Sequence, residues 1–301
     1  HSVMRSFMPD KPFILMESVP SLVNWHPYNK LKRPGVHKLS SIQAVACGSD
    51  TVQYFQWRKG RGSFEQYHGA VVDHLGRSDT RVFREVAEVG SILGKIGKTA
   101  GTIIKTDVAM LFDWSNRWAI ADMAGLSKDK KYEETCRKQY MLLLKKGIDM
   151  NIISPLADYS PYKVLIAPML YLLQPGVADK LKSFVNNGGI LIATWLTGYV
   201  NENTLCYLGG FPGDGLKELF GLYTEEIDTL YPSDKNSVYF EGELLDGTYE
   251  ISDFCEIIKP LTAQTLGVYT DDFYKGTPVV TVNSYGKGKA FYVGAKIHDL
   301  G

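Results

Sequence analysis

The sequence of 301 residues lacks the features that mark several large classes of protein. No apolar run approaches the roughly 20 residues that a membrane-spanning helix needs, and the opening HSVMRSFMPD holds no apolar stretch typical of a secretory signal. Lysine plus arginine number 33 and aspartate plus glutamate also number 33, so the formal net charge is zero. A nucleic-acid-binding protein normally shows an excess of basic residues. We therefore expect neither a membrane nor a nucleic acid as a partner.

Cysteine is also scarce, and its spacing excludes a metal site of the common kinds. Cys47, Cys136, Cys206 and Cys255 are far apart and form no CxxC pair. Disulfides are rare in proteins of the cytoplasm. We expect four reduced thiols in a cytoplasmic protein and no metal ligand among them.

What the sequence does contain at its start is an alternation of strands and helices. Residues 12–17, PFILME, form a short apolar run typical of a buried strand. Residues 33–49 have helical spacing, with Pro34 at the expected start and Gly48 at the expected end. Residues 50–58 predict a second strand, and residues 79–97 an amphipathic helix capped by Asp79 or Thr80. Strands joined by crossover helices pair in parallel. Two such units are too few to close a core, so we expect the chain to be a piece of a larger α/β barrel or sheet.

A second α/β pattern follows Gly101. Apolar runs at 102–113, 150–155, 162–170 and 189–195 predict buried parallel strands, because strands covered on both faces lack alternation. Residues 127–149 and 175–189 predict helices, and residues 277–295 a hairpin turning at GKGK. Residues 203–276 look irregular. The pattern predicts a doubly wound, flavodoxin-like sheet.

Four polar or aromatic side chains follow the two predicted strands of the first part. Glu17 ends the first strand and Trp25 lies in the loop after it, while Glu65 and His68 lie in the loop after the second strand. A carboxylate at the carboxyl end of a barrel strand is where such barrels carry out chemistry. Carboxylates and an imidazole can bind sugar hydroxyls while an aromatic ring packs on the apolar face of the sugar. If the strands are neighbours, these residues predict a sugar-binding pocket.

Each of the four has a plainer interpretation. Glu17 could anchor a loop as a hydrogen-bond acceptor, and Trp25 could belong to a core. Glu65 could be a solvated surface carboxylate, and His68 a surface or helix-capping histidine. The combination, rather than any member, favours the sugar site.

The motifs MESVPSLVNW (residues 16–25), YFQWR (residues 54–58) and EQYHGAVV (residues 65–72) resemble those of glycoside hydrolase family 42, the β-galactosidases. The resemblance covers residues 7–95 nearly without gaps. The segments LFDW, VLIAPMLYLL and NGGILIATW are similar, with lower specificity, to that family's trimerisation domain, which is related in shape to class I glutamine amidotransferases.

This resemblance implies a retaining β-galactosidase built on a (β/α)₈ TIM barrel, with Glu17 as the nucleophile and with Trp25, Glu65 and His68 lining the galactose subsite. Residues 1–102 would be the C-terminal part of the barrel, with its strands seven and eight. Residues 103–301 would be the flavodoxin-like trimerisation domain. The implied partners are a β-galactoside substrate and two further copies of the protein in a homotrimer.

The chain departs from the family pattern at one essential point. The family's acid/base is a glutamate after an asparagine on strand four, which lies upstream of this chain; Asn201-Glu202 is in the second part and is interpreted as a surface loop. The structural zinc of some members would also lie upstream, so no cofactor is expected. The corresponding amidotransferase turn holds Leu196 rather than a cysteine. Two alternatives therefore remain: the chain by itself is a catalytically silent oligomerisation module, or the protein binds sugar without cleaving it.

Overall fold

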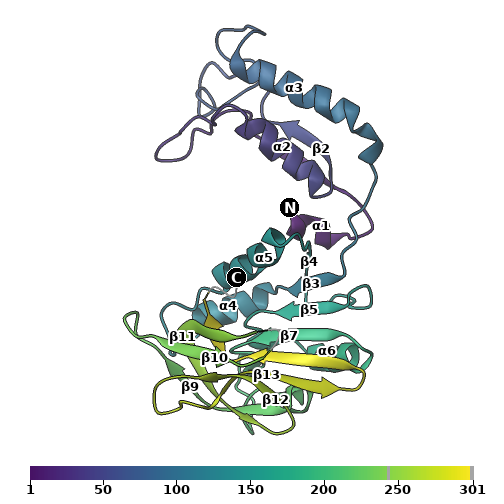
Figure 1. Cartoon of the computed structure of the whole chain (residues 1–301). Helices are drawn as coiled ribbons and strands as arrows, with labels where there is room; N and C mark the ends of the chain where they lie inside the picture. The colour runs from purple at the N-terminus through teal and green to yellow at the C-terminus, as the bar shows by residue number, and fades with distance from the viewer. Residues whose placement is uncertain (243–244, 299–301) are drawn as a thin grey trace. The chain divides into compact units, whose positions relative to one another are not determined.

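The computed structural model describes residues 1–242 and 245–298, which form two compact units, one from His1 to Lys105 and one from Thr106 onward. Figure 1 shows the helices and strands of both, most of them labelled. The last three residues of the predicted second domain, and two residues within the stretch interpreted as irregular, lie outside the described residues.

The first unit contains the predicted order of strand, helix, strand and helix. Its elements are α1 (Ser2–Phe7), β1 (Phe13–Ser18), α2 (Val36–Ala46), β2 (Ser49–Tyr54), α3 (Arg81–Lys95) and a 3₁₀ turn, η1 (Gly97–Thr99). β1 and β2 pair in parallel, from Phe13 opposite Ser49 to Ser18 opposite Tyr54. The predicted neighbouring parallel strands are confirmed; α1 was not predicted.

The helix ends follow from capping. Gly48 lies just past the end of α2 with φ of 102°, the left-handed conformation that lets a helix stop on glycine. The Oγ1 atom of Thr80 accepts a hydrogen bond from the backbone N–H of Phe83 at 3.3 Å, so Thr80 rather than Asp79 is the N-cap of α3. The helix predicted from Pro34 begins at Val36 instead, after Gly35, whose φ is 83°.

β2 ends at Tyr54, whereas the apolar pattern predicted a strand as far as Arg58. The backbone after Tyr54 turns to a different partner: Val71 N–H donates to the carbonyl of Gln56 at 2.9 Å, and Val72 N–H to that of Trp57 at 2.7 Å. Residues 56–58 therefore pair with a segment that follows the long loop, through an isolated bridge between Arg58 and Val72 rather than a continued strand.

The second unit is built on a mixed sheet of 11 strands among the described residues. Its helices are α4 (Trp114–Asp122), α5 (Tyr132–Lys145), α6 (Val177–Asn186) and α7 (Leu216–Phe220). Its strands are β3 (Val108–Leu111), β4 (Asn151–Ile153), β5 (Val164–Ala167), β7 (Ile190–Thr194), β9 (Leu222–Thr229), β10 (Asn236–Phe240), β11 (Gly247–Pro260), β12 (Gln264–Tyr269), β13 (Pro278–Tyr285), β14 (Gly288–Val293) and β15 (Ala295–Ile297). Two short strands, β6 (Leu172–Leu173) and β8 (Val200–Asn201), pair separately.

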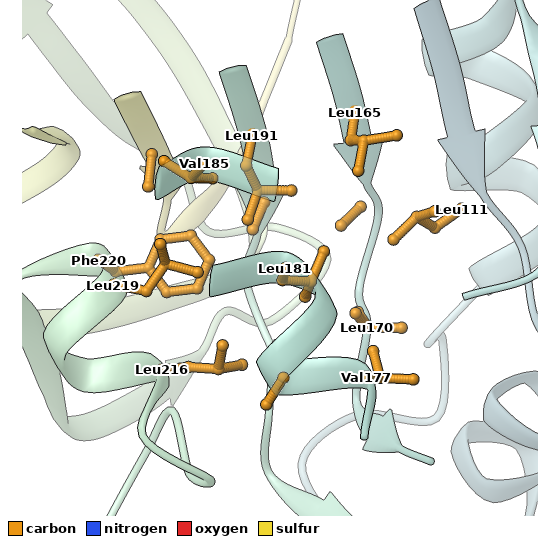
Figure 2. Packing of buried hydrophobic residues seen from close by; sticks show 14 of the residues in the cluster. Leu111, Leu165, Leu170, Val177, Leu181, Val185, Leu191, Leu216, Leu219 and Phe220 are labelled. Carbon is orange, nitrogen blue, oxygen red and sulfur yellow. The ribbon is translucent and has the colours of Figure 1, made fainter. Parts of the chain in front are cut away.

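One half of this sheet is parallel, in the order β4, β3, β5, β7 and β14. Successive side chains of its strands enter different cores. Leu111 and Leu165 pack in a cluster with α6 and α7, as Figure 2 shows around Leu181. Met110 and Ile166 instead pack in a cluster with α4 and α5. Both faces are covered, which explains the unbroken apolar runs of these strands. Burying each leucine side chain fully contributes about 1.5–3 kcal/mol.

The other half of the sheet is antiparallel. The predicted hairpin is confirmed, because β13 and β14 pair from Val280 opposite Val293 to Tyr285 opposite Gly288. The interpretation of residues 203–276 as irregular was wrong: β9, β10, β11 and β12 lie there. β11 is buried unevenly because it pairs with β9 over one stretch and with β10 and β15 over another, so it shows no single alternation. In the part of the chain described here, no helix is long and apolar enough to cross a bilayer.

Candidate active site

Glu17 lies at the carboxyl end of β1, and its side chain is exposed. The next residue holds the strand end in place, since Phe55 N–H donates to the carbonyl of Ser18 at 3.1 Å. The backbone around Glu17 is therefore fixed by β2, while its carboxylate remains accessible. A carboxylate presented in this way can act on a bound molecule rather than support the core.

His68 lies in the loop after β2 and is only 5% exposed. Its ring packs edge-on against Phe55 with 5.1 Å between ring centroids, and Nδ1 lies 3.1 Å from the carbonyl oxygen of Gly69. A carbonyl oxygen only accepts hydrogen bonds, so Nδ1 carries the hydrogen. In the neutral ring, Nε2 is then the nitrogen that can accept a hydrogen bond.

The loop that carries His68 packs closely on the segment after Glu17. Gly69 N–H donates to the carbonyl of Leu22 at 2.7 Å. A Cβ atom on Gly69 would lie 2.7 Å from that same oxygen and 2.8 Å from the Leu22 nitrogen. Only glycine permits this approach, which places the loop beside residues 19–22.

Trp25 and Glu65 complete the set of predicted residues. Trp25 is 68% exposed and its ring lies 4.0 Å from the ring of His26 between centroids, so it does not belong to a core of this unit. The side chain of Asn24 donates a hydrogen bond to the carbonyl of Phe64, which joins the residue before Trp25 to the residue before Glu65. Glu65 is exposed.

The fold thus gathers the segments that carry all four predicted residues. The strand end at Glu17, the segment up to Trp25 and the loop from Glu65 to Gly69 are joined by hydrogen bonds into one rim of the first unit. An accessible carboxylate, an exposed indole, a second carboxylate and an imidazole acceptor are the groups that a sugar site requires. No group of three or more histidine, cysteine or acidic side chains among the described residues is arranged to hold a metal ion.

Lys32 also belongs to this rim, although the sequence did not predict it there. Its amine donates to the carbonyl of Val19, and its backbone N–H donates to that of Ser21 at 3.4 Å. Burial lowers the pKa of Lys32. Nothing in the local pattern KLKRPG distinguishes this lysine from its neighbours, because its role depends on a backbone carbonyl 13 residues earlier.

In the second unit, the turn after β7 corresponds to the turn that holds the nucleophilic cysteine in class I glutamine amidotransferases. In this chain the turn holds Leu196 instead. Leu196 has φ of 62° and is fully buried. Its N–H donates to Oε1 of Glu256 at 2.8 Å. Burial raises the pKa of both buried thiols, Cys136 and Cys255, to about 12, so neither is a ready nucleophile.

Glu256 is a buried carboxylate that the sequence did not reveal. It lies on β11 and is 0% exposed. Its carboxylate also accepts hydrogen bonds from the hydroxyls of Tyr199 and Tyr292, each at 2.7 Å. Burial raises its pKa to about 7, and the three hydrogen bonds offset part of that effect. The segment DFCEIIKP shows only a lone glutamate in an apolar run, a weak signal of this role.

The fold and the rim define a mixed α/β protein with a carboxylate site at the end of a parallel strand. Comparison with known families makes this assignment specific. Residues 1–96 match the family model described as beta-galactosidase, and residues 106–301 match the model described as beta-galactosidase trimerisation domain.

Curated relatives agree over nearly the whole chain. Beta-galactosidase Pbg of Clostridium perfringens is 50% identical over 99% of this chain, and Beta-galactosidase BglY of Alicyclobacillus acidocaldarius is 48% identical over 99%. The chain spans 44% of the length of each of these two relatives.

Solved structures agree as well. Gan42B, a GH42 beta-galactosidase, superposes with a TM-score of 0.94 at 49% identity, over 99% of this chain and 43% of its own. The beta-galactosidase from Bacillus circulans sp. alkalophilus superposes with a TM-score of 0.95 at 43% identity, over 99% and 44%. The chain belongs to glycoside hydrolase family 42, the β-galactosidases.

Proposed function

We propose that this chain is the C-terminal part of a retaining β-galactosidase that hydrolyses terminal β-D-galactosyl residues. The observation that carries the proposal is the accessible carboxylate of Glu17 at the carboxyl end of β1, on a rim built with the loop of His68. The relatives named above are β-galactosidases. One solved structure is titled a catalytic mutant of Gan42B in which a glutamate is replaced by alanine, which supports a catalytic glutamate in this family.

In the proposed reaction, an oxygen of Glu17 attacks the anomeric carbon of galactose. The bond from that carbon to the leaving oxygen breaks, and the leaving oxygen takes a proton from a second carboxylic acid. Water then attacks the galactosyl ester and restores the Glu17 carboxylate, so the configuration is retained. The acid/base is assigned to a part of the protein upstream of this chain. The chain by itself is accordingly proposed to be inactive.

The remaining rim residues are proposed to bind galactose. The exposed ring of Trp25 offers a surface for the apolar face of the sugar. Nε2 of His68 accepts from a hydroxyl, because Nδ1 carries the hydrogen bonded to Gly69. The Glu65 carboxylate accepts from a further hydroxyl.

The proposal includes the architecture of the whole protein. β1 and β2 are assigned to strands seven and eight of a TIM barrel, with residues 1–102 as its C-terminal part. Residues 103–301 are assigned to a flavodoxin-like domain. Numbered along the chain, the five parallel strands lie in the order 2-1-3-4-5, which is the flavodoxin-like order, and apolar clusters with helices lie on both faces. Location in the cytoplasm stays a prediction.

The test is replacement of Glu17 by glycine in the complete enzyme. We expect the turnover of an aryl β-galactoside to fall by about a thousandfold, which corresponds to a rise of about 4 kcal/mol in the activation free energy. Azide should restore turnover and yield the galactosyl azide of α configuration, because a small nucleophile can occupy the place of the lost carboxylate. The control is Glu88→Gln, since Glu88 is an exposed residue of α3 that pairs with Lys38 of α2. Near-normal turnover without azide, or azide rescue giving the β product, would exclude Glu17 as the nucleophile.

A second function is favoured by the match of residues 106–301 to the trimerisation model. We propose that the second unit self-associates and that the complete protein is a homotrimer. Light scattering of the complete protein after size-exclusion chromatography should give three times the mass of one chain. A monomer at micromolar concentration would contradict this proposal and leave the catalytic one untouched.

A further inference from the structure

A buried histidine lies behind the candidate site, on the side of β2 covered by α2. His37 of α2 is 0% exposed, and neither of its ring nitrogens has a hydrogen-bond partner among the described residues. The hydroxyl of Tyr54 on β2 interacts with the side chain of Ser41 on α2 rather than with the His37 ring. Buried polar groups are normally paired. Burying two ring nitrogens without hydrogen bonds costs free energy, so we expect a role of this imidazole beyond packing.

His37 contacts the residue that sets the end of β2. Its ring lies 5.0 Å from the ring of Tyr54 between centroids, tilted by 58°. Tyr54 pairs with Ser18, directly after Glu17. The residue after Tyr54 is Phe55, which hydrogen-bonds to Ser18 and packs on His68. The His37 ring is thus linked through Tyr54 and Phe55 to two parts of the site. One is Ser18, the neighbour of Glu17, and the other is His68.

His37 is also coupled to the site electrostatically, through Lys32. Lys32 lies close enough to His37 for the two to interact electrostatically. The same Lys32 holds the backbone after Glu17 by its bond to the carbonyl of Val19. A positive charge on His37 would repel the ammonium group and weaken its hold on that carbonyl.

The groups facing His37 favour the uncharged ring. Lys32 from the loop and Arg81 from α3 oppose a positive charge, while Glu85 from α3 supports one. Tyr54 from β2 is uncharged, because burial raises the pKa of its hydroxyl above the ordinary value. The Glu85 carboxylate is already shared with Arg81 at 3.1 Å and with the N–H of Gly35 at 3.2 Å. Burial first, and then Lys32, lower the pKa of His37 below its ordinary 6.5.

We propose that His37 is a positioning residue for the site: its neutral ring holds the end of β2 and the backbone after Glu17 in place, and protonation in acidic solution loosens both. The role in catalysis rests on the proposed β-galactosidase function, whereas the structural effect does not. His37 would then contribute to the loss of activity at acidic pH without touching the substrate.

The test compares His37→Gln and His37→Phe with the unmodified enzyme between about pH 7.5 and about pH 5. Neither replacement titrates, and phenylalanine keeps the ring contact with Tyr54. Hydrogen exchange of peptides covering residues 13–25 and 49–58, corrected for intrinsic rates, should rise at least about threefold on acidification of the unmodified protein and stay level in the variants. In parallel, kcat for an aryl galactoside should fall less with acid in the variants, with KM at neutral pH unchanged.

The control is His74→Gln, because His74 is an exposed histidine of the same unit whose Nε2 lies 2.8 Å from the carbonyl oxygen of Gly60. It should follow the unmodified protein at every pH. Exchange in the unmodified protein that does not change with pH overturns the proposal even if neither His37 variant folds. Equal acid sensitivity in His37→Gln and His74→Gln overturns it as well. If Glu17→Gly shows normal turnover, the catalytic proposal fails, but the exchange data still decide the role of His37.

Discussion

Replacing Glu256 with glutamine should change how the stability of the second unit depends on pH. Glu256 is fully buried on β11, where it accepts hydrogen bonds from Leu196 N–H and from the hydroxyls of Tyr199 and Tyr292. Glutamine has nearly the same shape and keeps one acceptor oxygen for Leu196 and Tyr199. It has no charge at any pH, so the difference between the two proteins isolates the ionisation of this single group.

The magnitude follows from the raised pKa. Burial raises the pKa of Glu256 from 4.5 to about 7 in the folded state. The folded state therefore holds the proton more strongly than the unfolded state does. Stability from this group is complete below pH 4.5 and is lost progressively as the pH rises to about 7. At 1.36 kcal/mol per pH unit, the loss amounts to about 3 kcal/mol.

The assay is unfolding in urea at a series of pH values, with hydrogen exchange of peptides from β11 as the readout. This readout reports the second unit alone, since it follows residues 247–260. The free energy of unfolding of the unmodified protein, minus that of Glu256→Gln, should fall by about 3 kcal/mol between about pH 4.5 and about pH 8. A difference that is constant over this range would refute the reasoning. A difference that rises with pH would show that the three hydrogen bonds outweigh burial.

Two further substitutions test the rim and the helix behind it. Gly69→Ala places a Cβ atom 2.7 Å from the carbonyl oxygen of Leu22, so we expect a loss of about 1–3 kcal/mol in stability and a lower kcat/KM for a galactoside. Gly62→Ala, which meets no atom within 4 Å, is the matched control, and equal behaviour of the two variants would contradict the close approach. Thr80→Ala removes the side-chain acceptor for Phe83 N–H and should cost about 1 kcal/mol, measured by exchange of residues 81–95 in urea. An unchanged unfolding midpoint would show that Thr80 does not cap α3.

Much of the first unit was predictable because its signals are local. The apolar run before Glu17, the helical spacing around His37 and the capping pattern at Thr80 each depend on residues a few positions apart. The same holds for the parallel strands of the second unit, whose continuous apolar runs reflect a sheet covered on both faces.

The neighbourhood of the candidate site was predictable in part. Parallel pairing of β1 and β2 follows from the helix between them, and it brings Glu17 and the loop of His68 to the same edge. The sequence did not show that Gly69 contacts Leu22, or that Lys32 holds the carbonyl of Val19. Those contacts join residues that are distant in the sequence, so no local motif reveals them.

From the sequence alone came the strand–helix alternation of the first unit, the parallel strands of the second, the residue types at the strand ends and the family that they indicate, because periodicity and motif spacing are properties of neighbouring residues. Only the tertiary structure decided where β2 ends, which strands form the antiparallel half of the sheet, and that His37 and Glu256 are buried. The physical reason is that strand pairing and burial depend on partners distant in the chain, and a side chain's charge state depends on which of those partners surround it.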